Sequence, residues 1–435
     1  MTSVILRTPD AYRSICFSLR RGTVMSKIKK LSLAGIAFLT AGMAMSATTA
    51  PVVSAPAPPT VSAPDSTLLS RTKALLDKPS TWNNIPAKVT LCLFSPDGTK
   101  GRAYQYALEN MSQLPKYTAM AKEIGIDLTV TMTSPTSMRI ELGSAKLKRK
   151  AATDVKINMY TDERIASEDF KAGQCDGVAI SNLRARAYNP FVGSLDAVGA
   201  VLSYNQLTEA INILAKPEMA KLMVNQDIET VGIIPLGAAY VMVTDRKINT
   251  IAKAAGRKIA VLDFDKSQAN MVQKIGAQPV SVDLSSIGGK FNNHQVDILA
   301  APALVFQPLE LYRGMTDEQG NASGAIIKFP LLQVTGVMMM HRGKFPDGVG
   351  QLLREFTAMQ LAPAYQFILE TESAIPVKYW MDVPEADKPG YMNMLRNARL
   401  EITKDGFYDK RMMQLLKKIR CRIDPANYEC TMNDE

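Results

Sequence analysis

The sequence predicts an α/β fold with two lobes that are joined by crossing strands. Short runs of β-forming residues alternate with helical patterns along most of the chain, an order that is typical of α/β sheets. The strands are continuous apolar runs, which indicates a parallel sheet with helices on both faces. A chain of 435 residues is long enough for two such lobes and further segments.

Residues 1–46 are expected to be a leader that contains a signal peptide. Three lysines at 27–30 form a basic region, an apolar stretch follows, and 44–46 offers the small residues that a signal peptidase reads. The apolar stretch is shorter than the about 20 residues of a membrane span, which disfavours a membrane anchor. Either Met1 or Met25 is the true start. This pattern predicts export to the periplasm of a Gram-negative bacterium.

The net charge of +10 comes mostly from that leader, because residues 1–46 alone carry about +6. The charge therefore predicts no nucleic-acid binding by the mature chain. Residues 47–82 are rich in Pro, Ala and Ser, and we expect them to form an extended tether. No membrane span is expected in the mature chain, which we expect to be a monomer.

The folded part divides into elements that follow one another in order. Apolar, β-rich runs predict strands over 88–94, 126–132, 155–160, 177–181, 238–245, 258–265, 278–283, 295–302 and 324–342. Helical patterns cover 101–125, 167–173, 204–224, 267–276 and 347–370. Two of these helical patterns end at a glycine. The expected units are lobe I (83–238 with 325–365), lobe II (239–324) and a C-terminal helical extension (366–435).

Four cysteines follow the leader, an even number that predicts disulfides in an exported chain. Cys421 and Cys430 flank a turn-rich loop that closes easily, and such a bridge would stabilise the fold by roughly 2–3 kcal/mol. Cys92 and Cys175 lie in two predicted strands and form the favoured second pair. Three pairings are possible in principle, and four free thiols are the remaining alternative.

The chain is poor in groups that carry chemistry. It has two histidines, His294 and His341, and neither stands at a metal-ligand spacing from a cysteine or another histidine. We therefore expect no enzyme activity, no metal and no cofactor. Asp263 and Asp265 follow a strand as D-x-D, which is either a cation site or, more simply, a turn that caps the next helix.

Two places at strand ends carry basic residues that favour an anion. The segment SPDGTKGR (95–102) follows a strand and opens a helix, so Lys100 and Arg102 either join an anion site or lie on an ordinary turn. Arg184 and Arg186 follow the strand GVAIS, and ligands of open α/β sheets bind beyond such strand ends. A guanidinium binds a carboxylate through two parallel hydrogen bonds.

We expect one of these two arginines to face the cleft between the two lobes and to bind the anionic group of a ligand. Arg184 is the first choice because it is nearer the strand end. The alternative is that both are solvated. The complete set of candidate ligand-binding residues is Arg184, Arg186, Ser181, Asn182, Tyr188, Lys100, Arg102, Asp263 and Phe306.

An ordered set of motifs over about 155–360 resembles the solute-binding proteins of tripartite ATP-independent periplasmic (TRAP) transporters. The motifs are MYTDERIASEDFKAGQCDGVAIS, AAGRKIAVLD, IGAQPVSVD, HQVDILAAPA and FPLLQVTGVMMMHRGKFPDGVGQLLREF. The resemblance implies a type II periplasmic-binding-protein-like fold whose lobes close over a small solute. It also implies membrane transporter subunits as partners.

The chain departs from this family at one position. The residue after G-x-K-I is typically the arginine that binds the solute carboxylate, and here that residue is Ala260. Either Arg184 or Arg186 takes over this role, or the solute is not a simple organic acid. The first hypothesis is a periplasmic protein that captures a small anionic or polar organic solute. The alternative is an accessory or interaction protein of an envelope transport or efflux assembly.

Overall fold

The computed structural model describes residues 66–435, apart from 103 and 106–113. The expected leader, the choice between Met1 and Met25, and the first part of the tether lie outside the described residues. The middle of the helix expected over 101–125 does so too. Among the described residues, no helix is long and apolar enough to cross a membrane.

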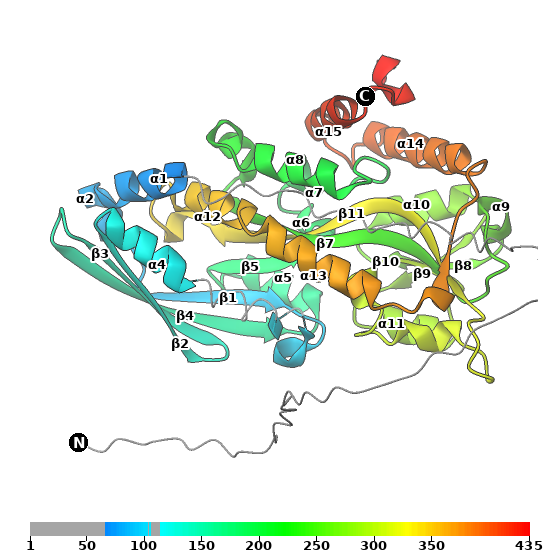
Figure 1. Ribbon diagram of the computed structural model, residues 1–435, viewed down its shortest axis with the longest axis horizontal. Helices are drawn as coiled ribbons and strands as arrows, with labels where there is room; N and C mark the ends of the chain where they lie inside the picture. Colours follow the sequence, from blue (N-terminus) through cyan, green and yellow to red (C-terminus); the bar gives the residue numbers. More distant parts are fainter. Residues whose placement is uncertain (1–65, 103, 106–113) are drawn as a thin grey trace, which may run out of the picture. The chain divides into compact units, whose positions relative to one another are not determined.

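One twelve-stranded sheet runs through the described part of the chain (Figure 1). The hydrogen-bonded order is β2-β3-β4-β1-β5-β11-β7-β10-β8-β9, with β12 beside β11 and β6 beside β7. The strands are β1 (Lys88–Phe94), β2 (Ile126–Ser134), β3 (Ser137–Ser144), β4 (Arg149–Tyr160), β5 (Gly177–Ser181), β6 (Val224–Asn225), β7 (Ile228–Val243), β8 (Lys258–Leu262), β9 (Gln278–Val282), β10 (Ile298–Pro302), β11 (Ala325–His341) and β12 (Trp380–Met381).

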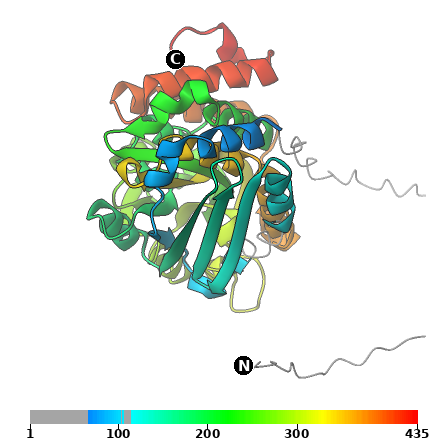
Figure 2. The same ribbon diagram turned by 90° about the vertical axis from the view of Figure 1, so that its left-hand side faces the viewer.

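Helices pack on both faces of this sheet (Figures 1 and 2). The α-helices are α1 (Ser66–Leu76), α2 (Pro79–Asn83), α4 (Leu114–Glu123), α5 (Glu163–Lys171), α6 (Asn182–Ala185), α7 (Pro190–Gly193), α8 (Tyr204–Leu214), α9 (Ile251–Ala254), α10 (Lys266–Lys274), α11 (Ile287–Asn292), α12 (Val349–Ala358), α13 (Leu361–Ser373), α14 (Lys388–Lys404) and α15 (Lys410–Ile423).

Two long strands, β7 and β11, join the two halves of the sheet. They pair antiparallel over most of their 16 and 17 residues. The register of the pair shifts on both sides of Pro330, because proline has no N–H to give to the ladder. The predicted crossing strands are therefore present, with β2-β3-β4-β1-β5 on one side and β10-β8-β9 on the other.

The sheet is mixed, which corrects the expectation of a parallel sheet. β1 pairs parallel with β4 and β5, and β8 pairs parallel with β9. β2, β3 and β4 are antiparallel neighbours, as are β5, β11, β7 and β10. The connections between β2, β3 and β4 are tight turns, which are too short for the crossover that parallel strands need. The sequence analysis missed β3 because most of its side chains are half-exposed and form no apolar run.

The expected tether ends earlier than we predicted. Residues 66–83 form α1 and α2 instead of an extended segment. Leu75 and Leu76 of α1 are buried, and the Trp82 indole donates a hydrogen bond to the Leu76 carbonyl at 2.7 Å. Buried apolar side chains give this segment a reason to fold that the Pro- and Ala-rich residues before it lack.

The C-terminal helices belong to the main hydrophobic core. α15 packs on α8, near α14, and buried residues of all three helices join those of the central strands (Figure 1). Members of this core include Cys92, Val178, Ile233, Val337, Leu207, Leu395 and Leu416. The segment expected as an extension, 366–435, thus contributes buried residues to the same core as the strands.

Both expected disulfides are present. Cys92 on β1 is bonded to Cys175, which precedes β5, and Cys421 on α15 is bonded to Cys430. β1 and β5 are parallel neighbours, so the first bridge joins adjacent strands of the sheet. The second bridge closes the loop after α15.

The two disulfides should differ in their contribution to stability. The first bridge spans 83 residues of sequence and the second spans 9. Because the unfolded chain loses more entropy when a longer loop is closed, replacing Cys92 and Cys175 by alanine should lower the free energy of unfolding by about 4–5 kcal/mol. The same change at Cys421 and Cys430 should lower it by about 2–3 kcal/mol. Urea titration measures both, and a larger loss from the second pair would contradict the loop-length argument.

Candidate functional site

The loop after β5 is held in place by a buried polar network. Ser181 ends the strand, and its hydroxyl accepts a hydrogen bond from the Arg184 backbone N–H, which starts α6. The side-chain amide of Asn182 donates to Asp196 Oδ1 at 3.0 Å. Asp196 also accepts from the backbone N–H and the hydroxyl of Thr335, at 2.9 and 2.6 Å. The end of β5 is thereby tied to the crossing strand β11.

Arg184 forms an ion pair with Glu163 of α5. Its Nε donates to Glu163 Oε2 at 3.0 Å, while Glu163 Oε1 accepts from the Ser181 backbone N–H. The Arg184 guanidinium carbon lies 4.0 Å from the ring centre of Phe264, in the turn between β8 and α10. This cation–π contact joins the half of the sheet that contains β5 to the half that contains β8.

Arg186 reaches the same turn by an ion pair. Its Nη1 donates to Asp265 Oδ2 at 3.3 Å, and its Nε donates to the Gly193 carbonyl at 3.2 Å. The guanidinium carbon is 5.1 Å from the ring centre of Tyr408. Asp265 also accepts from the backbone N–H groups of Ser267 and Gln268, so it caps α10. The D-x-D motif thus supplies a helix cap, the simpler of the two expected roles.

A cavity of about 430 Å³ lies beside Arg186. Its wall is formed by β5, β7, β8, β10 and β11, together with α10 and α14, and most of the lining side chains are aliphatic. Within the described residues, β8 and β10 are paired at a single position, Ile259 with Ile298. Consecutive residues of both strands, 259–262 and 298–302, line the cavity. The cavity therefore lies where the ends of β8 and β10 separate.

The polar part of the wall is small and contains opposite charges. Arg186, Asp196 and Asp265 all line the cavity, and so does Ser181. Burial raises the pKa of Asp196 to about 6, although the hydrogen bonds from Thr335 and Asn182 and the charge of Arg186 partly oppose this shift. One guanidinium and two carboxylates thus meet at one end of an aliphatic cavity.

The structure brings two of the candidate residues, Arg186 and Ser181, to the cavity wall, and the others lie away from it. Arg184, our first choice, is paired with Glu163 instead. Asn182 is fully buried beneath the loop. The Tyr188 hydroxyl contacts Ser167, and Phe306 is buried against Tyr312 and Tyr379.

The remaining candidates are on the surface. Lys100 and Asp263 are exposed, and the Arg102 guanidinium lies 5.9 Å from the ring centre of Phe367. Asp196 was not expected. Its one signal in the sequence is a lone acid within the small, apolar run GSLDAVGAV, a setting in which a carboxylate needs partners.

The C-terminal segment forms one wall of the cavity, which the sequence analysis did not foresee. Tyr391, Leu395 and Ile402 of α14 line it, followed by Tyr408. The Tyr408 hydroxyl accepts a hydrogen bond from the Val198 backbone N–H at 3.3 Å. This hydrogen bond attaches the segment after Asp196 to Tyr408, whose ring stacks on Arg186.

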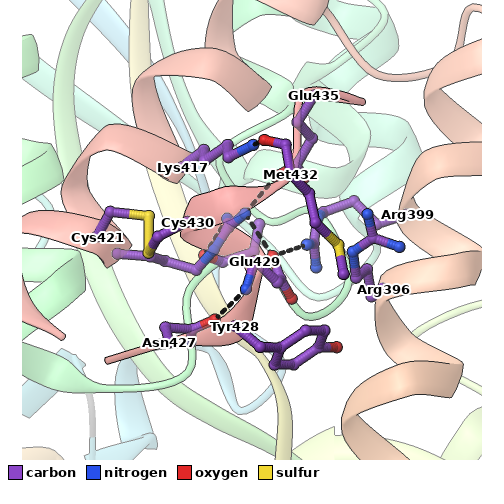
Figure 3. A network of polar contacts seen from close by, with 12 residues as sticks. Arg396, Arg399, Lys417, Cys421, Asn427, Tyr428, Glu429, Cys430, Met432 and Glu435 are labelled. Carbon is purple, nitrogen blue, oxygen red and sulfur yellow. Dashed lines mark hydrogen bonds and ion pairs between the residues drawn. A yellow bond between two sulfur atoms is a disulfide. The ribbon is translucent and has the colours of Figure 1, made fainter. Parts of the chain in front are cut away.

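A buried ionic cluster holds this C-terminal wall (Figure 3). Arg399 of α14 and Arg420 of α15 both donate to Glu429 Oε2, at 2.6 and 2.9 Å, and both also pair with Glu435. The side chains of the two arginines are at most 4% exposed. Burial, and then the charge of Arg399, lower the pKa of Arg420.

The same arginines bind the segment that leads to the cavity. Arg420 donates to the Ala200 carbonyl at 3.0 Å, and Arg399 donates to the Val198 carbonyl at 3.4 Å. Gly199 between them has φ +66, and a side chain there would collide with Leu395 and Arg399. The cluster thus fixes the position of the chain beside Asp196.

Comparison with known proteins identifies the family. The family model described as solute-binding protein AdeT 1/2 matches residues 45–435. The chain belongs to this solute-binding protein family. It is 46% identical over 282 residues to the probable solute-binding protein AdeT1 of Acinetobacter baumannii, covering 65% of this chain and 91% of that one. It is 28% identical over 242 residues to the probable solute-binding protein AdeT2 of the same organism, covering 56% of this chain and all of that one.

Solved structures confirm the fold expected from the resemblance. A TRAP periplasmic solute-binding protein of Ralstonia eutropha, solved with bound (S)-2-acetolactate, has a TM-score of 0.55 at 10% identity, over 78% of this chain and 100% of that chain. One from Shewanella oneidensis, solved with bound succinate, has a TM-score of 0.54 at 11% identity, over 77% and 99%. The comparisons favour the solute-binding hypothesis over an accessory protein without a solute.

Titration of Asp196 should make the stability depend on pH. Its pKa in the folded protein, about 6, lies above the ordinary value of 3.8 for an aspartate, so the folded state binds this proton more tightly than the unfolded state does. The contribution of Asp196 to stability is therefore greatest at low pH and is lost as the pH rises from about 4 through about 6.

Urea titration of the parent and of Asp196→Asn over this range tests this expectation. The free energy of unfolding of the parent should fall relative to that of the variant by about 2 kcal/mol between about pH 4 and about pH 7. A difference between the two proteins that does not change with pH would contradict the raised pKa.

Removing Glu429 should be strongly destabilising. Glu429→Ala takes a partner from two buried guanidinium groups, and breaking a buried pair in this way costs about 3–5 kcal/mol. Glu385→Ala is the matched control, because Glu385 pairs with Lys388 while its side chain is 87% exposed. Chemical denaturation should show a large loss for the first variant and little change for the second. Equal effects would mean that the buried cluster does not hold the wall.

Proposed function

We propose that this chain is the non-catalytic, periplasmic receptor of a membrane transporter and acts as a monomer. Membership of the solute-binding protein family supports this function. Two disulfides fit an oxidising compartment such as the periplasm. The signal peptide predicted over 1–46 would direct the chain there.

The solute is proposed to bind in the cavity beside Arg186. The observation that carries this proposal is the position of Arg186, a charged side chain on the wall of an otherwise largely aliphatic cavity beyond the end of β5. Binding sites for small molecules typically combine apolar walls with a few polar groups that orient the ligand. They also lie beyond the strand ends of α/β sheets.

Arg186 has the capacity to bind a polar or anionic group of a solute. Its Nε and Nη1 are engaged, but Nη2 has no hydrogen-bond partner among the described residues. The ion pair with Asp265 and the stacked ring of Tyr408 hold the Arg186 guanidinium in place. Arg184 is proposed to act differently, as a structural contact between Glu163 and Phe264.

Protein purified from the periplasm tests this function. A retained solute, identified by native mass spectrometry, or a compound from a broad panel should raise the melting temperature, since a ligand at 100 times its Kd adds about 2.7 kcal/mol. Arg186→Ala should then weaken binding by about 10- to 100-fold, because a hydrogen bond from a charged group is lost.

Arg184→Ala is the matched control. It also removes one partner of a buried acid, yet it does not touch the cavity wall, so binding should change little. Equal weakening by both variants would place the solute elsewhere. If no solute is retained and no compound of the panel binds, the result would count against the receptor function itself.

A further inference from the structure

We propose that the solute is an elongated, mainly hydrocarbon molecule with one uncharged polar end, and not a small organic acid. This inference rests on the proposed function, because it names the class of solute for the same cavity. Three observations support it: the charges at the polar end, the residue that replaces the expected arginine, and the shape of the space between β8 and β10.

The charges at the polar end disfavour an acid. Arg186 is already paired with Asp265 at 3.3 Å, and Asp196 lines the same cavity. Arg186 is the one Lys or Arg on the wall among the described residues, and the two aspartates are its only acidic residues. An entering carboxylate would share Arg186 with Asp265 and would lie close to a second carboxylate, Asp196, whereas like charges in one site repel each other. A hydroxyl or amide both donates and accepts, so it suits Arg186 and the aspartates together.

Ala260 leaves this part of the wall without the arginine that the resemblance implies for an organic acid. In the TRAP solute-binding proteins that this chain resembles, the arginine that binds a solute carboxylate typically stands at this position. Here Ala260 lies on the cavity wall, followed by Val261 and Leu262, which also line it. The wall at this point therefore offers an apolar surface, and an anion placed there would lose its hydration without gaining a partner.

The lining of the space extends to both sides of β8 and β10. Its wall includes Met271 of α10 and Leu395 of α14 on one side of the strands, and Ile287 of α11 and Leu309 on the other. Figure 1 shows α10 and α14 on the opposite side of β8 and β10 from α11. The two strands are paired at one position, Ile259 with Ile298, so their ends leave room between them. A flexible hydrocarbon chain fits such a passage better than a compact acid does.

The apolar cavity wall predicts how binding affinity should depend on the length of the solute's hydrocarbon chain. Each methylene group that moves from water into an apolar cavity contributes about 0.8 kcal/mol, which is about a fourfold gain in affinity. The volume of about 430 Å³ lies within the range of small-molecule sites, so the gain should continue over several methylenes before it levels off.

Two matched series of compounds test the inference on the parent protein. Calorimetry at neutral pH compares hexanol, octanol and decanol with hexanoate, octanoate and decanoate, and includes succinate. The alcohols should gain about fourfold per methylene, and each carboxylate should bind at least about tenfold more weakly than the alcohol of the same length. Succinate should not bind.

The outcomes separate this inference from the proposed function. Tight binding of succinate or of the shorter carboxylates, with loss in Arg186→Ala, would overturn the solute class and leave the receptor function intact. Binding by neither series would also overturn the solute class, and the retained-solute experiment would then judge the function independently.

Two substitutions at Ala260 give a second measurement. Ala260→Leu and Ala260→Arg both fill space, so both should weaken decanol binding, by about tenfold or more when the space of two methylenes is lost. Ala260→Arg alone should gain affinity for succinate, because it supplies the missing cation. Unchanged decanol binding in both variants would show that the hydrocarbon does not lie at Ala260. If Ala260→Arg does not fold, the compound series on the parent still decides the question.

Discussion

The buried pairing of Arg399 and Arg420 with Glu429 and Glu435 constrains how the C-terminal segment packs on the rest of the described chain. Charges that are removed from water must be paired and hydrogen-bonded, so α14, α15 and the loop after α15 are restricted to an arrangement that satisfies all four groups. The Cys421–Cys430 bridge closes the loop that carries Glu429. Because the arginines also bind the carbonyls around Gly199, this constraint extends to the cavity.

The sequence predicts those features that depend on local pattern. The bounds of β5 follow from the short apolar run GVAIS between polar residues, and the two disulfides follow from an even number of cysteines near strands and turns. The sequence does not distinguish Arg184 from Arg186. Their partners Glu163 and Asp265 lie 21 and 79 positions away, and the contact of Tyr408 with Val198 spans 210 positions. Such contacts arise from packing, which no local pattern encodes.

The solute class that we propose differs from the ligands of solved proteins that share this fold. Proteins with this fold were solved with small organic acids, but likeness at 10–11% identity shows the fold alone. In this chain the wall at Ala260 is apolar, and the C-terminal helices add aromatic and aliphatic side chains. Both features support the less polar solute that we propose.

The two arginines after β5 have related roles, since both contact the turn between β8 and α10. Arg184 stacks on Phe264, and Arg186 pairs with the adjacent Asp265. These contacts join the two sides of the sheet beside the cavity. A solute that bound Arg186 by displacing Asp265 would break one of them, and it would leave a buried carboxylate with fewer partners. A solute that bound Nη2, for which the described residues offer no partner, would leave both contacts intact. The geometry therefore favours a polar group that adds to the Arg186–Asp265 pair over an acid that replaces it.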